Sequence, residues 1–446
     1  MSAEPRTITD LSRLLQARTL TATDVTERCL QCIAEHEPSI NAYITVLADE
    51  ARAQARAADA EIAAGRYRGP LHGVPMSLKD LIDLRGTPTT AASKVRAEHI
   101  AHGDALVTAR LRDAGAVFTG KTNLHEFAFG TTNEDSAYGA VHHPLDLTRS
   151  PGGSSGGSAA SVLAGMAYAS IGTDTGGSIR IPSSICGLVG LKPVVGEIPV
   201  DGVVPLSALL DHVGPICRSV EDARLVYHAL RGVSQPPPPR RRDLRGLRFG
   251  IPRPYFLALL DPQVSARFDD ACRRLSAAGV ILDEVAIPHA DDAAAIYLHL
   301  VLPEAAAYHA PTLDSRPDDY SPNVRLRLEM GRYILGEDYV RALRGRDALI
   351  ADVNIALDGR DALLLPTMPI GATTLGAVTV SIGGRDEPVR NAMLRLTQTF
   401  NITGHAAMSI PCGRTNEGLP VGLQLVNART SDVLEVAAAI EPTLEQ

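Results

Sequence analysis

The chain of 446 residues contains no tryptophan, and only 4% of its residues are aromatic. Its acidic side chains outnumber the basic ones, 51 Asp and Glu against 43 Lys and Arg, which gives a net charge of −8. Proteins hold single-stranded nucleic acids by stacking bases on aromatic side chains, and they hold phosphate backbones with basic surfaces. Because the sequence has little of either, we expect no direct binding of nucleic acid.

Cysteine is also scarce, and its six residues are too few and too scattered for a disulfide scaffold in a chain of this length. This favours a reducing compartment, and we expect the protein in the cytoplasm. Cys29 and Cys32 form a C-x-x-C motif. The residues around them have the pattern of an amphipathic helix, so we interpret both thiols as packing groups rather than a redox or zinc site.

Long hydrophobic segments are missing as well. Residues 1–6 contain no apolar stretch typical of a secretion signal. The uncharged stretches 150–173 and 362–384 are rich in Gly, Ala and Ser or are interrupted by proline, so neither predicts a membrane span. The 13 histidines lack the spacing of a zinc site, and we expect no metal and no other cofactor.

Short apolar segments alternate with helical patterns along the chain. This alternation predicts an α/β protein with a mixed or parallel sheet covered by helices. Thr23 is the expected cap of an early helix. Strands are predicted over residues 74–82, 116–119, 168–173, 244–251, 280–287, 362–365, 407–410 and 421–426. Helices are predicted over residues 48–64, 104–114, 158–166, 263–278, 323–352 and 432–440.

We interpret residues 1–446 as one domain with four consecutive parts. Residues 1–65 form a helical N-terminal layer, and residues 66–232 form the catalytic core. Residues 233–243, rich in Pro and Arg, are expected to be a surface connection. Residues 244–446 supply the rest of the sheet and the helices that cover the pocket.

Residues 115–122 match the P-loop pattern G-x-x-x-x-G-K-[ST]. In a working P-loop the strand ends before the first glycine, and the intervening residues form the phosphate-binding loop. Here residues 116–119 are themselves the best strand candidate. A helix, a strand and a polar turn are therefore the favoured interpretation.

Residues 152–156 match the nucleophile-elbow pattern G-x-S-x-G, with Ser154 at the centre. An elbow needs a hydrophobic strand that leads directly into the first glycine. Residues 147–151 are a poor strand, and His405 or His309 could complete a triad only by default. This interpretation is less well supported than the one below.

A third interpretation joins three segments. Lys79 lies in the apolar stretch 73–80, and two Gly/Ser-rich loops contain Ser154 and Ser178. A lysine accepts a proton only where burial favours its neutral form, and a serine becomes a good nucleophile only when a partner takes its proton. The three residues can form a relay in which Ser178 attacks, Ser154 passes its proton on, and Lys79 receives it.

The glycines beside Ser178 suit the same chemistry. Residues 175–178 read Thr-Gly-Gly-Ser. Because glycine adopts backbone angles that other residues avoid, such a loop can direct several N–H groups at one point. Backbone donors of this kind stabilise a developing oxyanion by about 2.7 to 4 kcal/mol each.

At this point the sequence resembles the amidase signature family, which includes fatty acid amide hydrolase, malonamidase and the glutaminase component of glutamyl-tRNA amidotransferase. The resemblance is strong over residues 73–230. It is most specific in residues 151–193, which end in Cys-Gly-Leu-Val-Gly-Leu-Lys-Pro. It implies a large mixed, mostly parallel central sheet covered on both faces by helices. It also implies Ser178 as the acyl-enzyme nucleophile, Ser154 as a bridging serine preceded by a cis peptide, and Lys79 as the base.

The resemblance implies roles for further residues. Those of the oxyanion hole would be Thr175, Gly176, Gly177 and Ser178. Those flanking the acyl pocket would be Ala128, Phe129, Gly130 and Thr131. Those supporting the loops would be Asp174, Arg180 and Ser155.

For the activity, the resemblance implies a free-standing hydrolase that acts on small amides and anilides, and also on carbamates or esters, as a monomer or homo-oligomer. The alternative is the A (glutaminase) subunit of a glutamyl-tRNA amidotransferase. The glutamine site of that subunit uses an acid shortly before an L-T-x-x-x-N segment. Here the segment is residues 396–401, residues 391–395 contain no acid, and Leu394 stands at the matching position. This argues against an α-amino acid substrate.

Overall fold

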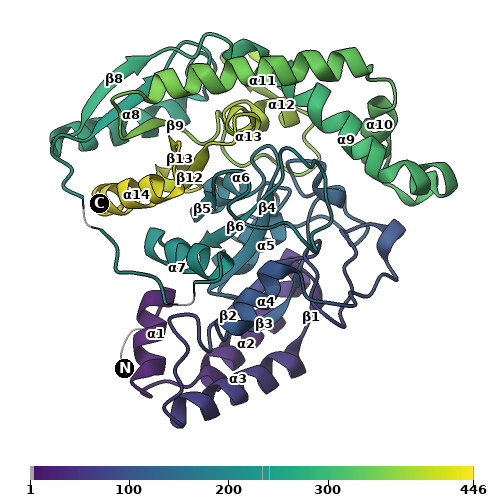
Figure 1. Ribbon diagram of the computed structural model, residues 1–446, viewed down its shortest axis with the longest axis vertical. Coiled ribbons are helices and arrows are strands. Elements are labelled where there is room, and N and C mark those ends of the chain that lie inside the picture. Colours follow the sequence, from purple (N-terminus) through teal and green to yellow (C-terminus); the bar gives the residue numbers. More distant parts are fainter. Residues whose placement is uncertain (1–4, 234, 241, 445–446) are drawn as a thin grey trace.

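The computed structural model describes residues 5–233, 235–240 and 242–444, and one mixed sheet of 11 strands runs through its centre (Figure 1). The strands lie in the order β1-β3-β2-β4-β6-β5-β12-β13-β9-β7-β8. Their bounds are β1 Tyr43–Val46, β2 Pro75–Lys79, β3 Val117–Thr122, β4 Ala169–Asp174, β5 Val189–Lys192, β6 His212–Cys217, β7 Arg248–Pro252, β8 Ile281–Val285, β9 Ala362–Pro366, β12 Ala406–Arg414 and β13 Pro420–Asn427. A separate hairpin consists of β10 Thr379–Ile382 and β11 Arg385–Pro388.

The α/β class and the large mixed sheet are confirmed, but the expected majority of parallel pairs is wrong. The parallel pairs are β2–β3, β2–β4, β7–β8 and β7–β9. The six other neighbouring pairs of the sheet are antiparallel. The centre of the sheet is antiparallel partly because β12 and β13 form a hairpin through a short turn, which needs no crossover helix.

Helices cover both faces of the sheet, as β6 demonstrates. Successive side chains of a strand point to opposite faces. Ile216 packs with Ala159 of α5, whereas its neighbour Cys217 belongs to the main core, together with Val226 of α7. The α-helices are α1 Ile8–Gln16, α2 Ala22–Ile40, α3 Ala48–Ala63, α4 Leu106–Asp113, α5 Gly156–Leu163, α6 Arg180–Cys186, α7 Val220–Leu230, α8 Pro262–Ala277, α9 Ala293–Ser315, α10 Pro322–Gly331, α11 Gly336–Leu357, α12 Val389–Leu394, α13 Gln398–Ile402 and α14 Thr430–Leu444.

The N-terminal layer contains α1, α2 and α3, but also the edge strand β1, which the sequence pattern did not predict. The predicted cap of α2 is shifted. Thr21 caps the helix and accepts from Asp24 N, while the predicted Thr23 donates instead to Asp59. The layer is therefore mixed rather than purely helical.

The helical stretch predicted over residues 323–352 is two helices. α10 ends at Gly331 and α11 begins at Gly336, and glycine has a low helix propensity. Figure 1 shows both helices with α9 at the end of the molecule opposite α1 and α3. α9 packs against both α10 and α11, and α11 also contacts β7 and β9.

Residues 235–240 of the Pro/Arg-rich connection are irregular and mostly exposed, while residues 234 and 241 lie outside the described residues. The division of the chain into four parts stays a prediction. Among the described helices, none combines the length and the apolar character that crossing a membrane requires.

The sheet brings the first two segments of the predicted site together. β2 and β4 are parallel neighbours, with Leu78 opposite Ile171. Because neighbouring parallel strands end at the same edge of a sheet, the last residue of β2, Lys79, lies beside the last residues of β4. The loop that carries Ser178 follows β4 directly.

Candidate active site

Lys79 is fully buried at the end of β2. Its Nζ lies 2.8 Å from Ser154 Oγ and 2.9 Å from Thr173 Oγ1. Neither of these oxygens carries a formal charge, so the amine has hydroxyl neighbours but no ion-pair partner among the described residues. The environment therefore solvates a neutral amine better than an ammonium group.

Burial lowers the pKa of Lys79 to about 7. The carboxylates of Asp174 and Asp211 act in the opposite direction, because a negative charge favours the ammonium form. The burial effect is larger. A substantial fraction of Lys79 is therefore neutral near pH 7 and able to take a proton.

Ser154 and Ser155 lie in the loop before α5. The peptide bond between Gly153 and Ser154 is cis, as the resemblance implied. Ser155 Oγ donates to Thr173 O at 3.2 Å, and Ser155 N donates to Ser178 O at 3.3 Å. Ser155 thus ties its own loop to the end of β4 and to the backbone of Ser178.

Ser178 precedes α6 and is 5% exposed. Its carbonyl bonds to Ser155, but no hydrogen bond joins its hydroxyl to that of Ser154 in the described part of the chain. The structure therefore brings Lys79 and Ser154 into direct contact and places Ser178 on the adjoining loop. The second link of the predicted relay is not formed in this conformation.

Asp174 and Arg180 form a buried ion pair that spans this loop. Arg180 Nε lies 3.0 Å from Asp174 Oδ2, and Nη2 lies 2.9 Å from Oδ1. Asp174 Oδ2 also accepts from the backbone N of Ile179 and Arg180. Burial alone would raise the pKa of Asp174, but Arg180 outweighs it and holds the pKa well below its ordinary value. The pair fixes both ends of the segment that contains Ser178.

The Asp174–Arg180 ion pair, called the brace below, is also bonded to residues far along the chain. Arg180 donates through Nη1 to Gln424 Oε1 at 2.7 Å and through Nη2 to Asn401 Oδ1 at 2.6 Å. Asn401 Nδ2 in turn donates to Asp174 Oδ1 at 2.8 Å. In the sequence, Asn401 served only as a marker of the glutamine site, and no role for Gln424 was predicted. The loop around Ser178 is thereby attached to α13 and β13.

The predicted oxyanion segment is held from both sides. Thr175 Oγ1 donates to Asp211 Oδ1, and Thr397 Oγ1 donates to Gly176 O, both at 2.6 Å. Burial raises the pKa of Asp211 to about 6. Gly177 has a φ of 144°, and a Cβ there would lie 2.3 Å from Thr397 Oγ1. Only glycine fits at this position, because a side chain would be strained by the positive φ and would clash with Thr397.

The segment predicted to flank the acyl pocket lies next to the serine loop. A Cβ on Gly153 would lie 3.1 Å from the carbonyl carbon of Thr131, so the two backbones nearly touch. A Cβ on Gly130 would overlap the His125 ring at 2.0 Å. Ala128, with a φ of 58°, and Phe129 are both buried, and Phe129 O accepts from Arg327 Nη1 at 2.7 Å.

The two competing motifs do not form their sites. Lys121 of the P-loop pattern is a buried residue of β3 whose Nζ lies 2.8 Å from Asp80 Oδ1. No strand leads directly into Gly152 of the elbow pattern, because among the described residues the preceding strand, β3, ends at Thr122. The side chains of His405 and His309 bond instead to Asn354 and Tyr320, respectively.

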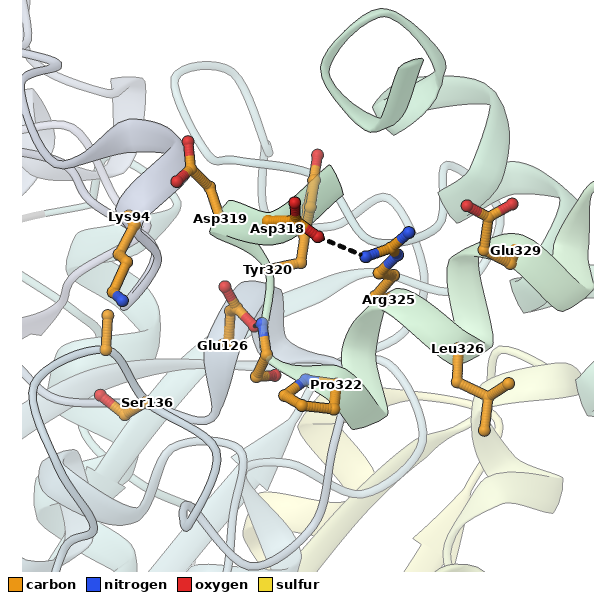
Figure 2. A pocket seen from close by; sticks show the side chains of 12 residues that line it. Lys94, Glu126, Ser136, Asp318, Asp319, Tyr320, Pro322, Arg325, Leu326 and Glu329 are labelled. Atoms are coloured by element: carbon orange, nitrogen blue, oxygen red, sulfur yellow. Dashed lines mark hydrogen bonds and ion pairs between the residues drawn. The ribbon is translucent and has the colours of Figure 1, made fainter. Parts of the chain in front are cut away.

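A cavity of about 740 Å³ opens between two short 3₁₀ helices, η1 Lys94–Arg96 and η4 Pro317–Asp319, and α10 (Figure 2). Figure 2 shows Glu126 and the ion pair of Arg325 with Asp318 among the lining side chains, with Arg325 Nη1 2.7 Å from Asp318 Oδ1. Lys79, Ser154 and Ser178 do not line it. The three residues predicted to be catalytic therefore lie outside this cavity.

Several residues beside the serine loops had no sequence signal. Asp211 and Tyr297 lie in regions without a recognisable motif, and Arg327 and Arg390 are single basic residues in ordinary helical patterns. Only the fold brings them together. A weak signal existed for Gly176, since paired glycines leave space for a close neighbour. That neighbour is Tyr297, whose hydroxyl would lie 2.6 Å from a Cβ on Gly176.

Comparison with known proteins agrees with this geometry. The chain matches the Amidase family model over residues 24–434. An amidase of Pseudomonas putida is 42% identical over 428 residues, which cover 93% of this chain and 90% of the relative. The A subunit of the glutamyl-tRNA(Gln) amidotransferase of Acidothermus cellulolyticus is 38% identical over 480 residues, which cover 98% and 94%. A solved amidase structure superposes with a TM-score of 0.93 at 36% identity, covering 98% of this chain and 100% of the other. The chain belongs to the amidase signature family and is a hydrolase of carbon–nitrogen bonds.

Proposed function

We propose that the chain hydrolyses small amides through an acyl-enzyme intermediate, with Ser178 as nucleophile, Ser154 as bridging group and Lys79 as base. The observation that carries the proposal is the buried amine of Lys79, which lies 2.8 Å from Ser154 Oγ with a pKa lowered to about 7. An amine in this state has little function in packing, but it is suited to general base catalysis near neutral pH.

Acylation begins when Ser178 rotates its hydroxyl toward Ser154, a movement that no hydrogen bond to that hydroxyl opposes among the described residues. Ser178 Oγ attacks the amide carbon while its proton passes to Ser154 Oγ, and the proton of Ser154 passes to Lys79 Nζ. The carbonyl oxygen becomes an oxyanion. The backbone N–H groups of residues 175–178 stabilise this charge.

Breakdown of the intermediate reverses the proton path. Lys79 returns a proton through Ser154 to the leaving nitrogen, the C–N bond breaks, and the amine departs. Water then attacks the acyl-enzyme, with the same two residues acting as base, and Ser178 is released. Anilides, carbamates and esters have a carbonyl of the same shape, so we include them among the substrates.

Asp174, Arg180 and Ser155 act as supporting residues in this proposal. The ion pair and the bonds of Ser155 hold the two serine loops at a fixed separation. Rigid positioning matters because small displacements of reacting groups cost large factors in rate. Ala128, Phe129, Gly130 and Thr131 would form one wall of the acyl pocket.

A second candidate is the glutaminase subunit of a glutamyl-tRNA amidotransferase, which the 38% identity to such a protein favours. Leu394 is the observation against it. Its Cδ2 would lie 2.9 Å from a Cβ on Gly176, so an apolar group faces the oxyanion segment where the resemblance expects an acid. We therefore favour a free-standing amidase, as a monomer or homo-oligomer in the cytoplasm. The free thiols of all six cysteines support that location.

The test is to assay the purified chain alone on aryl and alkyl amides, anilides, esters, carbamates and glutamine. Ser178→Ala, Ser154→Ala and Lys79→Ala should each lower amide turnover by at least about 100-fold while the protein stays folded. Ser155→Ala is the matched control, because it removes a neighbouring hydroxyl whose bond is to a backbone carbonyl. Its loss should be about tenfold or less.

If the control is as damaging as the three other variants, the assignment of roles is wrong. If glutamine is the preferred substrate and partner chains co-purify, the glutaminase interpretation replaces ours. If no amide, ester or carbamate is hydrolysed, the proposed function fails altogether.

A further inference from the structure

The segment of residues 203–211 begins beside the base of the predicted relay and ends beside the predicted oxyanion segment. The backbone N–H of its second residue donates to the carbonyl oxygen of Leu81, in the loop that follows Lys79, at 2.8 Å. At the other end, Asp211 Oδ1 accepts from Thr175 Oγ1 at 2.6 Å. One short segment is therefore bonded to both parts of the proposed site.

The antiparallel register of β4 and β6 explains why Asp211 meets Thr175. Asp174, the last residue of β4, pairs with His212, the first residue of β6. In an antiparallel pair, one step forward along the first strand lies opposite one step back along the second. The step beyond this pair leads to Thr175 on one side and to Asp211 on the other. The sheet itself therefore brings the acid to the first residue of the oxyanion segment.

Asp211 is bonded to its own segment as well as to Thr175. Its Oδ2 accepts from Leu206 N at 2.8 Å and from Ser207 N at 3.1 Å. These three donor residues are buried, so water does not readily take the place of the bonds. A carboxylate accepts on two oxygens without donating, and it can therefore bind a hydroxyl and two N–H groups at once. Asp211 thus fastens the Thr175 side chain to a turn of the backbone.

Glu304 of α9 holds the middle of the same segment. Its Oε2 accepts from Ser207 Oγ at 2.6 Å and from Leu209 N at 3.3 Å. Its Oε1 accepts from Tyr339 Oη of α11 at 2.8 Å. Because Ser207 also donates its backbone N–H to Asp211, the hydrogen bonds run from α9 and α11 to Asp211. We call the bonds from Glu304 through this serine and Asp211 to the threonine the carboxylate connection.

α9 also reaches the oxyanion segment directly. Tyr297 lies about two helical turns before Glu304, so both side chains point to the same side of α9. The hydroxyl of Tyr297 would lie 2.6 Å from a Cβ on Gly176, the residue after Thr175. One side of α9 therefore contacts the oxyanion segment twice, directly at Gly176 and through the carboxylate connection at Thr175.

We propose that Asp211 and Glu304 are positioning residues, which fix the Thr175 backbone and thereby aim the donors of the oxyanion segment. This inference rests on the acyl-enzyme mechanism proposed above and adds two residues that do not touch the substrate. Backbone donors stabilise an oxyanion only when they point at the place where its charge develops. The Thr175 hydroxyl makes no other hydrogen bond among the described residues, so loss of the connection frees the start of the segment. Small displacements of such groups cost large factors in rate.

The experiment measures kcat and KM for a neutral anilide and the inhibition constant Ki of phenylboronic acid. The pH is about 8.5, where Lys79, with a pKa of about 7, is mostly neutral. Phenylboronic acid is the probe of the oxyanion segment. Ser178 Oγ forms a bond to boron, the hydroxyl proton passes through Ser154 to Lys79, and the boron becomes tetrahedral and negatively charged. One boron-bound oxygen then takes the place of the oxyanion.

Thr175→Val and Glu304→Ala should each lower kcat about 10- to 100-fold, change KM less than about twofold, and raise Ki by a factor similar to the loss in kcat. Thr175→Ser should recover most of the activity, because it keeps the hydroxyl. Glu304→Gln should do the same, since its amide oxygen accepts from Ser207 and Leu209 while its NH₂ group donates to Tyr339 Oη. The double variant Thr175→Val/Glu304→Ala should lose little more than the worse single variant, because both changes interrupt one connection.

Glu197→Ala is the matched control. Glu197 is also a partly buried carboxylate that accepts from a tyrosine hydroxyl, Tyr227 Oη at 2.9 Å, and from Thr430 Oγ1, but it lies outside the carboxylate connection. Its removal should leave kcat and Ki within about twofold of the wild-type values. A loss equal to that of Glu304→Ala would mean that any such carboxylate supports activity through stability alone, and it would overturn the proposal. If Glu304→Ala does not fold, Ser207→Ala interrupts the same bond and takes its place in every comparison.

The outcomes separate this inference from the proposed function. Full activity in Thr175→Val or Glu304→Ala would refute the positioning roles. So would independent, multiplying losses in the double variant, or a fall in kcat without a rise in Ki. In each of these cases the wild-type protein would still hydrolyse the anilide and Ser178→Ala would still be inactive, so the amidase function would stand. A wild-type protein that neither hydrolyses an amide nor binds phenylboronic acid would refute the proposed function, and this inference with it.

Discussion

Acidification should stop amide hydrolysis because it protonates Lys79. The amine must be neutral to take the proton of Ser154, and its pKa is lowered to about 7. The neutral fraction falls tenfold for each pH unit below the pKa, so kcat/KM at pH 5 should be about 100-fold below its plateau above pH 8. The direction of the pH dependence follows from the lowered pKa of Lys79: activity rises as the pH passes through about 7 and is lost below it.

The assay is the pH dependence of kcat/KM for a neutral anilide, which has no titrating group of its own. Circular dichroism at pH 5 serves as the control for folding. The histidines near the site do not account for a step at pH 7, because burial lowers the pKa of His212 to about 3 and that of His405 to about 4. The other group that could cause a step near pH 7 is Asp211, whose pKa is raised to about 6.

Asp211→Asn distinguishes the two groups. The carboxylate of Asp211 raises the pKa of Lys79, so removing its charge should lower that pKa further and move the step to lower pH. If Asp211 itself were the titrating group, the step would disappear in the variant. A step that disappears, or a wild-type profile that is flat down to pH 5, would refute the reasoning about Lys79.

Three further predictions concern the loops. Ser154→Ala should lower kcat by about 100- to 10,000-fold with little change in KM, since it interrupts proton transfer rather than binding, and steady-state kinetics would check this. Gly176→Ala should also lower kcat, because its Cβ would lie 2.6 Å from Tyr297 Oη, and Tyr297→Phe in the same chain should restore part of it. Asp174→Asn should lower the free energy of unfolding by about 3 to 5 kcal/mol in urea denaturation, because it leaves the buried charge of Arg180 uncompensated; a loss below about 1 kcal/mol would contradict the brace.

The sequence predicted the local parts of this molecule well. The segments with Lys79, Ser154 and Ser178 are short motifs whose chemistry depends on neighbouring residues, and the strands before Lys79 and Asp174 have clear apolar patterns. The parallel pairing of those two strands explains why the motifs meet. The catalytic roles of these residues stay predictions until the variants are made.

The rest depended on contacts that no local pattern encodes. β5 and β6 are short and contain Gly or Pro, and α9 contains Pro303 and Pro311, so all three were missed. The antiparallel centre of the sheet follows from strand order, which alternation does not specify.

The brace around Arg180 has a consequence for synthesis of the chain. Lys79, Ser154 and Ser178 all leave the ribosome early, yet the groups that fix Arg180 belong to residues 397, 401 and 424. The loop that carries Ser178 therefore gains this support only after residues 397–424 have been made. We expect a nascent chain that stops before residue 397 to contain Lys79, Ser154 and Ser178 and still be inactive.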